Sequence, residues 1–176
     1  MKIAIIGSGG REHALVHQLS KSKKLTKIYS IPGNAGTEEI SLNIDLNLEN
    51  FQDLYDFIYK EQIELVIVGP EKPLVEGLVD FLESKNIKVF GPRKKVAQLE
   101  GSKIFTKQIC EKFNIPTAKF KICRSKEDSF LFLSSSNFPI VVKADVLAAG
   151  KGVYICQNVD EAKTAINEIF DGKFGK

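Results

Sequence analysis

The sequence predicts an α/β protein, with a parallel-sheet domain followed by a smaller α+β unit. Short apolar runs, such as Lys2–Gly7 and Leu65–Val68, alternate with helical patterns in the first half of the chain. This alternation is typical of βαβ units around a parallel sheet. Glycine and proline end these runs, for example at Gly69-Pro70. After Pro92 the pattern changes to a long helical stretch, which indicates a second unit.

Residues 1–92 are predicted to form the first domain. Its expected strands are Lys2–Gly7, Lys27–Ile31, Leu65–Val68 and Lys88–Phe90. Its expected helices are residues 11–21, a helix with Phe51, Leu54, Tyr55 and Ile58 on one face, and a helix that has Pro73 in its first turn and Leu74, Leu78 and Phe81 on its apolar face. Residues 32–37 are expected to be a loop, because proline, glycine and asparagine gather there.

Residues 93–117 are predicted to be a connecting helical segment, and residues 118–176 a small α+β unit. The helical segment is interrupted at Gly101 and ends before Pro116, because proline disfavours helix in the residue that precedes it. The small unit is expected to contain strands at 119–123, 140–143 and 153–156, a helix at 126–133 and a helix from Asp160. A glycine-bearing loop, Val146–Gly152, joins the last two strands.

Composition limits the class of protein. In the 176 residues, 43% are hydrophobic and 27% charged, as in an ordinary soluble globular protein, and no apolar stretch is long enough to span a membrane. The net charge of +3 gives no sign of a nucleic-acid or membrane-surface partner. Because the apolar opening is too short for a signal peptide, we expect a cytoplasmic protein.

Cysteine and histidine give no metal motif. Cys110, Cys123 and Cys156 are far apart, and we interpret them as reduced, mostly buried thiols. His13 and His17 have the spacing of a zinc-binding pair, but the glutamate that such a motif needs between them is absent. We therefore predict no metal ligands in this chain.

The first candidate site is the loop Gly7–His13, between a strand and a helix. Glycines here let backbone N–H groups approach an anion, and the helix N-terminus adds partial positive charge. The dinucleotide fingerprint needs a third glycine where Glu12 stands. A single phosphate therefore fits better than a pyrophosphate, with Glu12, at an exposed helix start, available for sugar hydroxyls or an amine. The alternative is a tight turn with no ligand.

Two further loops follow strands of the same predicted sheet. Because the carboxyl ends of parallel strands meet at one edge, we expect Gly9, Asn34, Gly36 and Glu71 to converge there. Turn formation alone is the alternative for each loop taken singly.

The second candidate site is the segment 143–152, together with Lys103. Small residues and glycines allow a loop to close over a triphosphate, and Lys143 and Lys151 supply point charges for phosphate oxygens. Gly152 stands where a Walker A loop needs serine or threonine, so the segment is not of that type. Lys103 alone is more typical of a solvated surface lysine, whereas Lys143 ends an apolar strand, where an unpaired charge would be costly.

These motifs together resemble the phosphoribosylamine-glycine ligases, members of the ATP-grasp superfamily. The resemblance rests on GSGGREHAL at 7–15, PGNAGT at 32–37, VGPE at 68–71, LEGSK at 99–103 and KADVLAAGKGV at 143–153. It implies a Rossmann-like, pre-ATP-grasp domain followed by the start of an ATP-grasp module. Such members run well beyond this length, so the chain resembles an N-terminal part that is inactive alone.

The resemblance also implies roles for particular residues. The phosphoribosylamine site would be formed by Gly9, Gly10, Arg11, Glu12, Asn34, Gly36 and Glu71. The ATP phosphates would be contacted by Lys103 and Lys143, beneath a lid of Gly150, Lys151 and Gly152. Val146 stands where the family usually has glycine. The magnesium or manganese ligands, the adenine site and the glycine site would lie beyond Lys176.

The implied reaction joins glycine to 5-phosphoribosylamine at the expense of ATP, through glycyl phosphate. Its partners would be these small molecules and the rest of the same protein. Two alternatives stay open from the residues alone. One is a nicotinamide-binding oxidoreductase domain, against which Glu12 argues. The other is a non-catalytic phosphosugar-binding protein that uses only residues 1–92.

Overall fold

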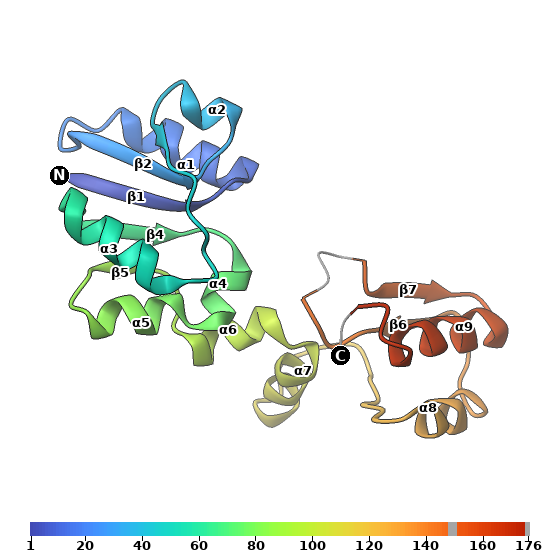
Figure 1. Ribbon diagram of the computed structural model, residues 1–176. Coiled ribbons are helices and arrows are strands. Elements are labelled where there is room, and N and C mark those ends of the chain that lie inside the picture. Colours follow the sequence, from blue (N-terminus) through green and yellow to red (C-terminus); the bar gives the residue numbers. More distant parts are fainter. Residues whose placement is uncertain (148–150, 175–176) are drawn as a thin grey trace. The chain divides into compact units, whose positions relative to one another are not determined.

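The computed structural model describes residues 1–147 and 151–174 and divides the chain into two compact units, Met1–Gln98 and Leu99–Lys176 (Figure 1). The parallel-sheet domain predicted from the sequence is present in the first unit. No helix in the described part of the chain is long and apolar enough to cross a membrane.

The first unit contains a five-stranded parallel sheet in the order β3-β2-β1-β4-β5. Its strands are β1 (Lys2–Gly7), β2 (Lys27–Pro32), β3 (Leu42–Asn43), β4 (Leu65–Val68) and β5 (Val89–Phe90). The long strands form because their apolar runs are buried, as both faces of a parallel sheet are covered by helices. β1 lies centrally, between β2 and β4.

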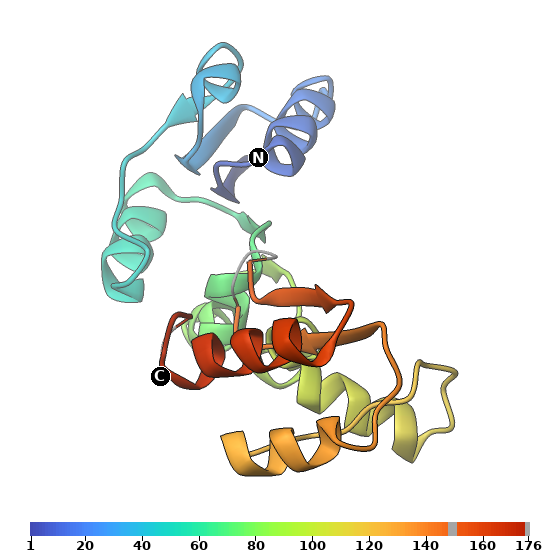
Figure 2. The ribbon, with the colours of Figure 1, turned by 90° about the vertical axis from the view of Figure 1, so that its right-hand side faces the viewer.

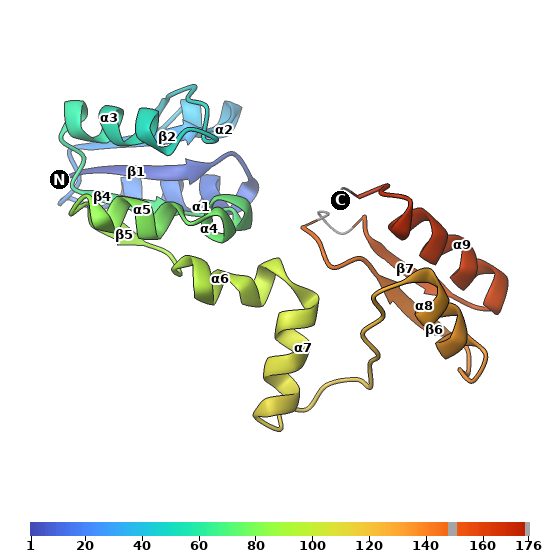
Figure 3. The same ribbon diagram turned by 60° about the horizontal axis from the view of Figure 1, so that its bottom comes forward.

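Helices cover both faces of this sheet. They are α1 (Gly10–Ser20), α2 (Ala35–Glu38), α3 (Phe51–Glu61), α4 (Glu71–Glu76) and α5 (Leu78–Ser84), and α6 (Lys94–Gly101) then leads out of the unit. Val16 of α1 packs with Ile3 and Ile5 on one face. Helix α3 lies along the other face, where Leu54 and Ile58 are fully buried (Figure 3).

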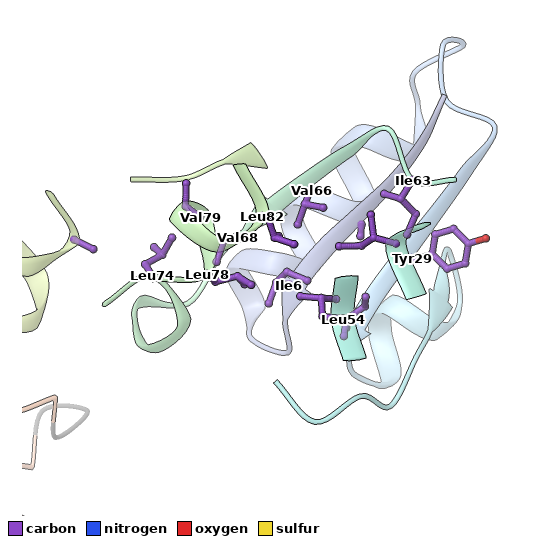
Figure 4. Close-up of a cluster of buried hydrophobic side chains, with 14 residues drawn as sticks. Ile6, Tyr29, Leu54, Ile63, Val66, Val68, Leu74, Leu78, Val79 and Leu82 are labelled. Atoms are coloured by element: carbon purple, nitrogen blue, oxygen red, sulfur yellow. The ribbon is translucent and has the colours of Figure 1, made fainter. Parts of the chain in front are cut away.

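The larger core cluster lies on the α3 face and joins strands that are distant in the sequence (Figure 4). Its labelled side chains are Ile6, Tyr29, Leu54, Ile63, Val66, Val68, Leu74, Leu78, Val79 and Leu82. Burial of each large apolar side chain stabilises the fold by roughly 1.5–3 kcal/mol. Side chains of β1 and β4 in this cluster therefore hold the two central strands together.

Two local predictions for this unit need correction. The single helix expected to carry Leu74, Leu78 and Phe81 is two helices, because Gly77 adopts a left-handed φ of 103° between α4 and α5. The predicted loop at 32–37 begins in β2 and then forms the short helix α2, which Asn34 caps with its side chain. Local hydrogen bonding by asparagine, rather than loop composition, decides this segment.

The second unit is built on the antiparallel pair β6 (Ile140–Lys143) and β7 (Val153–Cys156). Its helices are α7 (Lys103–Lys112), α8 (Lys126–Leu133) and α9 (Val159–Phe170). Helix α9 lies along the strand pair (Figure 2), and its buried Ala162, Ala165 and Ile166 pack with Leu133 of α8 and Cys156 of β7.

The strand predicted at 119–123 does not form. A strand requires a hydrogen-bonded neighbour, and within the described part of the second unit the sheet contains β6 and β7 only. The alternating apolar residues of this segment, Phe120 and Ile122, are only half-buried. The prediction that the cysteines are mostly buried is also wrong, because Cys110 and Cys123 are only partly buried and Cys156 alone is fully so.

Candidate phosphate-binding and nucleotide-binding sites

The carboxyl ends of β1 and β4 form the topological switch point of the parallel sheet. From β1 the chain proceeds to β2 on one side, whereas β4 pairs with β1 on the other. In open parallel sheets, ligands bind in the crevice at such a point. Backbone bonds hold the loops together here: Gly33 N donates to Gly7 O at 3.2 Å, and Gly69 N donates to Ile6 O at 3.1 Å.

Glu12 lies in the first turn of α1 and is buried, with only 4% of its surface exposed. The expectation of an exposed helix start was therefore wrong. Its Oε2 accepts a hydrogen bond from Gly9 N at 2.7 Å. Its Oε1 is buried and has no hydrogen-bond partner among residues 1–147 and 151–174. A buried carboxylate oxygen without a donor is costly, so this atom is the strongest indication of a ligand in the unit.

Asn34 connects the second loop to the first. Its Oδ1 accepts from Gly36 N at 2.8 Å and from Thr37 N at 3.1 Å, which caps α2. Its Nδ2 donates to Ser8 O at 2.9 Å and to Gly9 O at 3.4 Å. The amide is thus engaged on both sides by the protein itself, and its direct effect is to fix one loop against the other.

Asn43 and Thr37 hold the backbone of Asn34 in place through side-chain hydrogen bonds. Thr37, which is fully buried, donates from Oγ1 to Asn43 Oδ1 at 2.7 Å, and Asn43 Nδ2 donates to Asn34 O at 2.7 Å. These bonds fix the backbone of Asn34 as well as its side chain. The second loop is therefore held by a connected network rather than by one contact.

The other predicted phosphoribosyl residues surround the same helix start. Arg11 Nη2 lies 3.5 Å from Glu71 Oε2, and the Arg11 side chain is 78% exposed. Such an exposed pair contributes little to stability, so the guanidinium is free to meet an anion. A Cβ on Gly10 would meet no atom of the described residues within 4 Å. Gly36 instead lies against the His13 ring: a Cβ there would be 2.4 Å from His13 Cε1.

In the second unit, Lys103 is attached to the segment that follows β6. It is partly buried and donates from Nζ to Val146 O at 3.0 Å. Nearby, Asp145 Oδ1 accepts from Ile104 N at 3.0 Å, and its carboxylate also accepts from Ser102 Oγ at 2.9 Å. Asp145 and Ser102 together cap the start of α7, since Ser102 Oγ accepts from Phe105 N. Lys103 is therefore not a freely solvated lysine.

Lys143 stands at the end of β6, opposite Val153 of β7. It is exposed, so the argument that its charge is buried was wrong: the β6–β7 pair is covered by helices on one face only. Lys151 is exposed and Gly152 is buried, with Gly152 O accepting from Ala144 N at 2.9 Å. The predicted lid residue Gly150 lies outside the described residues.

Metal-ligating side chains do not gather in the described parts of either unit. Across residues 1–147 and 151–174, no group of three or more histidines, cysteines, aspartates or glutamates has the arrangement to hold a metal ion.

Comparison with known families divides the chain at nearly the same position as the two structural units do. The model described as phosphoribosylglycinamide synthetase, N domain, matches residues 1–100. The model described as the ATP-grasp (A) domain of the same synthetase matches residues 101–176. The chain belongs to the phosphoribosylglycinamide synthetase family.

Curated relatives carry the name phosphoribosylamine–glycine ligase. The protein of Rhizobium meliloti is 47% identical over 99% of this chain, and that of Caldanaerobacter subterraneus is 46% identical over 95% of it. The matched regions make up 41% and 40% of those two proteins. The chain thus spans about two-fifths of the length of these synthetases.

Solved structures agree on the fold. The crystal structure of phosphoribosylamine–glycine ligase from Thermotoga maritima matches 93% of this chain and 38% of its own, with 33% identity and a TM-score of 0.74. A biotin carboxylase domain from Hydrogenobacter thermophilus matches 97% of this chain and 41% of its own, with the same TM-score and 22% identity. The latter likeness shows the shared fold alone.

Sequence reasoning missed several residues of the two candidate sites. Gly69 borders the Glu12 carboxylate, Asn43 supports Asn34, and Asp145 caps α7. Gly69 and Asp145 lie inside motifs that were noted, but only their neighbours were chosen. The signal that could have found Gly69 is a glycine directly after a buried strand that neighbours β1. Asn43 gave no signal, because β3 has only two residues.

Proposed function

We propose that the first unit binds the phosphoribosyl substrate of a phosphoribosylamine–glycine ligase, at the switch point beside α1. The observation that carries this proposal is the buried Glu12 carboxylate, whose Oε1 lacks a partner in the described structure. An amine or a sugar hydroxyl supplies the missing donor. The exposed Arg11 and the start of α1 suit the phosphate. Gly9, Gly10, Asn34, Gly36 and Glu71 shape the rest of the site.

In the second unit we propose that Lys103 and Lys143 contact the phosphates of ATP. Lys103 already holds the segment after β6 through Val146 O, so phosphate binding at this lysine is coupled to the position of that segment. Gly150, Lys151 and Gly152 would form the lid. Lysine suits this role as a compact charge with rotatable donors.

The whole protein would then catalyse ATP-dependent amide formation between glycine and 5-phosphoribosylamine. The glycine carboxylate attacks the γ-phosphorus of ATP, which releases ADP and gives glycyl phosphate. The amine of phosphoribosylamine attacks the carbonyl carbon of that intermediate, phosphate leaves, and the amine loses a proton. The products are glycinamide ribonucleotide, ADP and phosphate. This chain carries only part of the machinery, so we propose that it is inactive alone.

Magnesium or manganese would neutralise the triphosphate in the whole protein. The biotin carboxylase domain of similar fold was solved in complex with MgADP, and we propose that the nucleotide of this protein is likewise a magnesium complex. We propose that the metal ligands lie outside the residues described, and that the protein acts in the cytoplasm on small molecules.

A calorimetric titration of the chain with ribose 5-phosphate tests the first unit. We expect saturable binding of ribose 5-phosphate and no binding of NAD, because the Glu12 side chain occupies the position at which the dinucleotide fingerprint requires glycine. Glu12→Gln should weaken the binding, since it replaces the free acceptor with a donor while it keeps an acceptor for Gly9 N. Glu111→Gln, on the exposed side of α7, is the charge-matched control.

Three results would each contradict a part of the proposal. NAD binding without ribose 5-phosphate binding would support a nicotinamide-binding domain. Equal affinity in wild type and Glu12→Gln would remove Glu12 from the site. Binding of ribose 5-phosphate by this chain, with no glycine-dependent ATP turnover by the whole gene product, would instead support a phosphosugar-binding protein without the ligase reaction.

A further inference from the structure

Three glycines from different parts of the first unit surround the Glu12 carboxylate. A Cβ on Gly69, directly after β4, would lie 2.2 Å from Glu12 Oε1 and 2.7 Å from its Cγ and Cδ. A Cβ on Gly7, at the end of β1, would lie 2.6 Å from Glu12 Cγ, and one on Gly9 would lie 2.8 Å from Oε2. Real Cβ atoms do not make contacts this short, so the buried carboxylate fits only because these positions lack side chains.

We propose that Gly69 is a positioning residue, which keeps the Glu12 carboxylate in the orientation that gives Oε2 to Gly9 N and leaves Oε1 for the ligand. The identity of the ligand rests on the proposed function, but the packing of Glu12 against Gly69 does not. A substitution at Gly69 tests the volume of the added side chain more cleanly than one at Gly7. At Gly7 the φ of 126° would itself disfavour any side chain. Gly69 does not adopt a left-handed φ. Alanine at 69 therefore acts through its volume.

The predicted effect of Gly69→Ala is a displaced carboxylate rather than an unfolded domain. The atoms that the new methyl would meet are the outer atoms of a flexible side chain, which move at little cost. Once displaced, Glu12 loses its 2.7 Å bond from Gly9 N. The displaced carboxylate then no longer presents Oε1 to the ligand, and a lost charge-assisted bond to a ligand lowers its affinity by about tenfold or more.

Gly91 provides a matched control. A Cβ there would lie 2.9 Å from Leu74 Cδ2 and 3.1 Å from Val79 Cγ2, so it is similarly crowded but faces apolar core atoms. Gly91→Ala should lower the melting temperature without changing ligand affinity or the surroundings of Gly9. If Gly69 had only the packing role of any crowded glycine, Gly69→Ala and Gly91→Ala would change melting temperature and ligand affinity alike.

The experiment uses the complete 176-residue chain. The amide resonance of Gly9 in a ¹H–¹⁵N correlation spectrum reports the bond to Glu12, and calorimetry reports the dissociation constant of ribose 5-phosphate. We expect Gly69→Ala to move the Gly9 amide proton upfield and to raise the dissociation constant about tenfold or more. An unmoved Gly9 resonance in folded Gly69→Ala protein overturns the inference, and so does unchanged affinity.

The double variant Glu12→Ala/Gly69→Ala covers the case in which Gly69→Ala fails to fold. Removal of the Glu12 side chain beyond Cβ eliminates every atom that the Gly69 methyl would meet most closely. The double variant should then fold, and its melting temperature should lie close to that of Glu12→Ala alone. If it is also unfolded, the contact with Glu12 is not the reason for glycine at 69.

Failure of the proposed function would be distinguishable from failure of this inference. If wild-type protein does not bind ribose 5-phosphate, the assignment of the ligand is wrong. The Gly9 resonance of Gly69→Ala would still test whether Gly69 positions the carboxylate, because that readout needs no ligand.

Discussion

The Asn34 side chain has two roles: its Oδ1 caps α2, and its Nδ2 donates to the first loop. Replacement of Asn34 by aspartate removes only the second role. Aspartate keeps the acceptor that caps α2 but loses both Nδ2 donors to the first loop. It also sets a carboxylate oxygen near Ser8 O, where an N–H donor stood 2.9 Å away. Alanine, in contrast, removes the cap and the donors together. The two variants therefore differ in local charge and capping at one position.

The magnitudes follow from these bonds. The cap is worth about 1 kcal/mol and the bond to Ser8 about 1 kcal/mol, whereas the 3.4 Å contact to Gly9 O adds little. Asn34→Ala should therefore lower the free energy of unfolding by about 2 kcal/mol. Asn34→Asp keeps the cap but adds repulsion between oxygens. We expect a loss of about 1–2 kcal/mol, since the site is partly exposed and the repulsion is screened.

Ligand affinity should rank the two variants differently from stability. The added charge in Asn34→Asp lies beside the loop proposed to receive a phosphate, so ribose 5-phosphate affinity should fall further than in Asn34→Ala. The difference should shrink at high salt, because exposed charges are screened. Urea denaturation and calorimetry at two salt concentrations measure both quantities. Equal affinities of Asn34→Asp and wild type at low salt would refute the reasoning.

Three other predictions concern different parts of the molecule. Leu54→Ala, at a fully buried site on α3, should lower the free energy of unfolding by about 2–5 kcal/mol in urea titrations. In the whole protein, Lys143→Ala should weaken ATP binding by on the order of 1.5–3 kcal/mol through one lost charge-assisted contact, and wild-type affinity would remove Lys143 from the site. Tyr29→Phe should flatten the pH dependence of stability at both ends. The Tyr29 hydroxyl lowers the pKa of Glu61 below 4.5, which stabilises the fold above that pH and is lost as pH falls through the folded value. Burial and this bond raise the pKa of Tyr29 above 10.0, so that contribution is present below pH 10.0 and is lost as pH rises through the folded value. An unfolding midpoint that varies with pH in Tyr29→Phe as it does in wild type, with or without a constant offset, would contradict the last prediction.

The central strands could be predicted because the local sequence pattern alone indicates that they are buried. In β1, five of the six residues are buried, and a short apolar run that ends in glycine indicates such a strand directly. Helix α3 was equally clear, since Leu54 and Ile58 recur at helical spacing and are the residues that become buried. In these elements local pattern and tertiary packing agree.

The errors arose where tertiary neighbours decide the outcome. The segment 119–123 has apolar alternation, but pairing depends on a neighbouring strand, which no local pattern reveals. Lys143 follows an apolar run, but only one face of β6–β7 is covered, so its side chain is exposed. For Glu12, local rules place a glutamate of the first helical turn at the surface, where it caps the helix. Its burial depends on Gly69, 57 positions away in sequence (69 − 12).

The Glu12 site also explains why a glycine-rich strand-to-helix loop need not bind a dinucleotide. In the dinucleotide fingerprint, glycine at this helix position brings the helix close to the strand and the pyrophosphate close to the helix. Here the helix position carries the side chain, and the absence of side chains at Gly7 and Gly69 on the neighbouring strand ends makes room for it. The carboxylate at this switch point then has one oxygen without a partner in the described residues, and a carboxylate disfavours a pyrophosphate and favours a hydrogen-bond donor. We therefore expect the ligand specificity at this switch point to depend on which of the two facing elements, the helix start or the strand ends, lacks side chains.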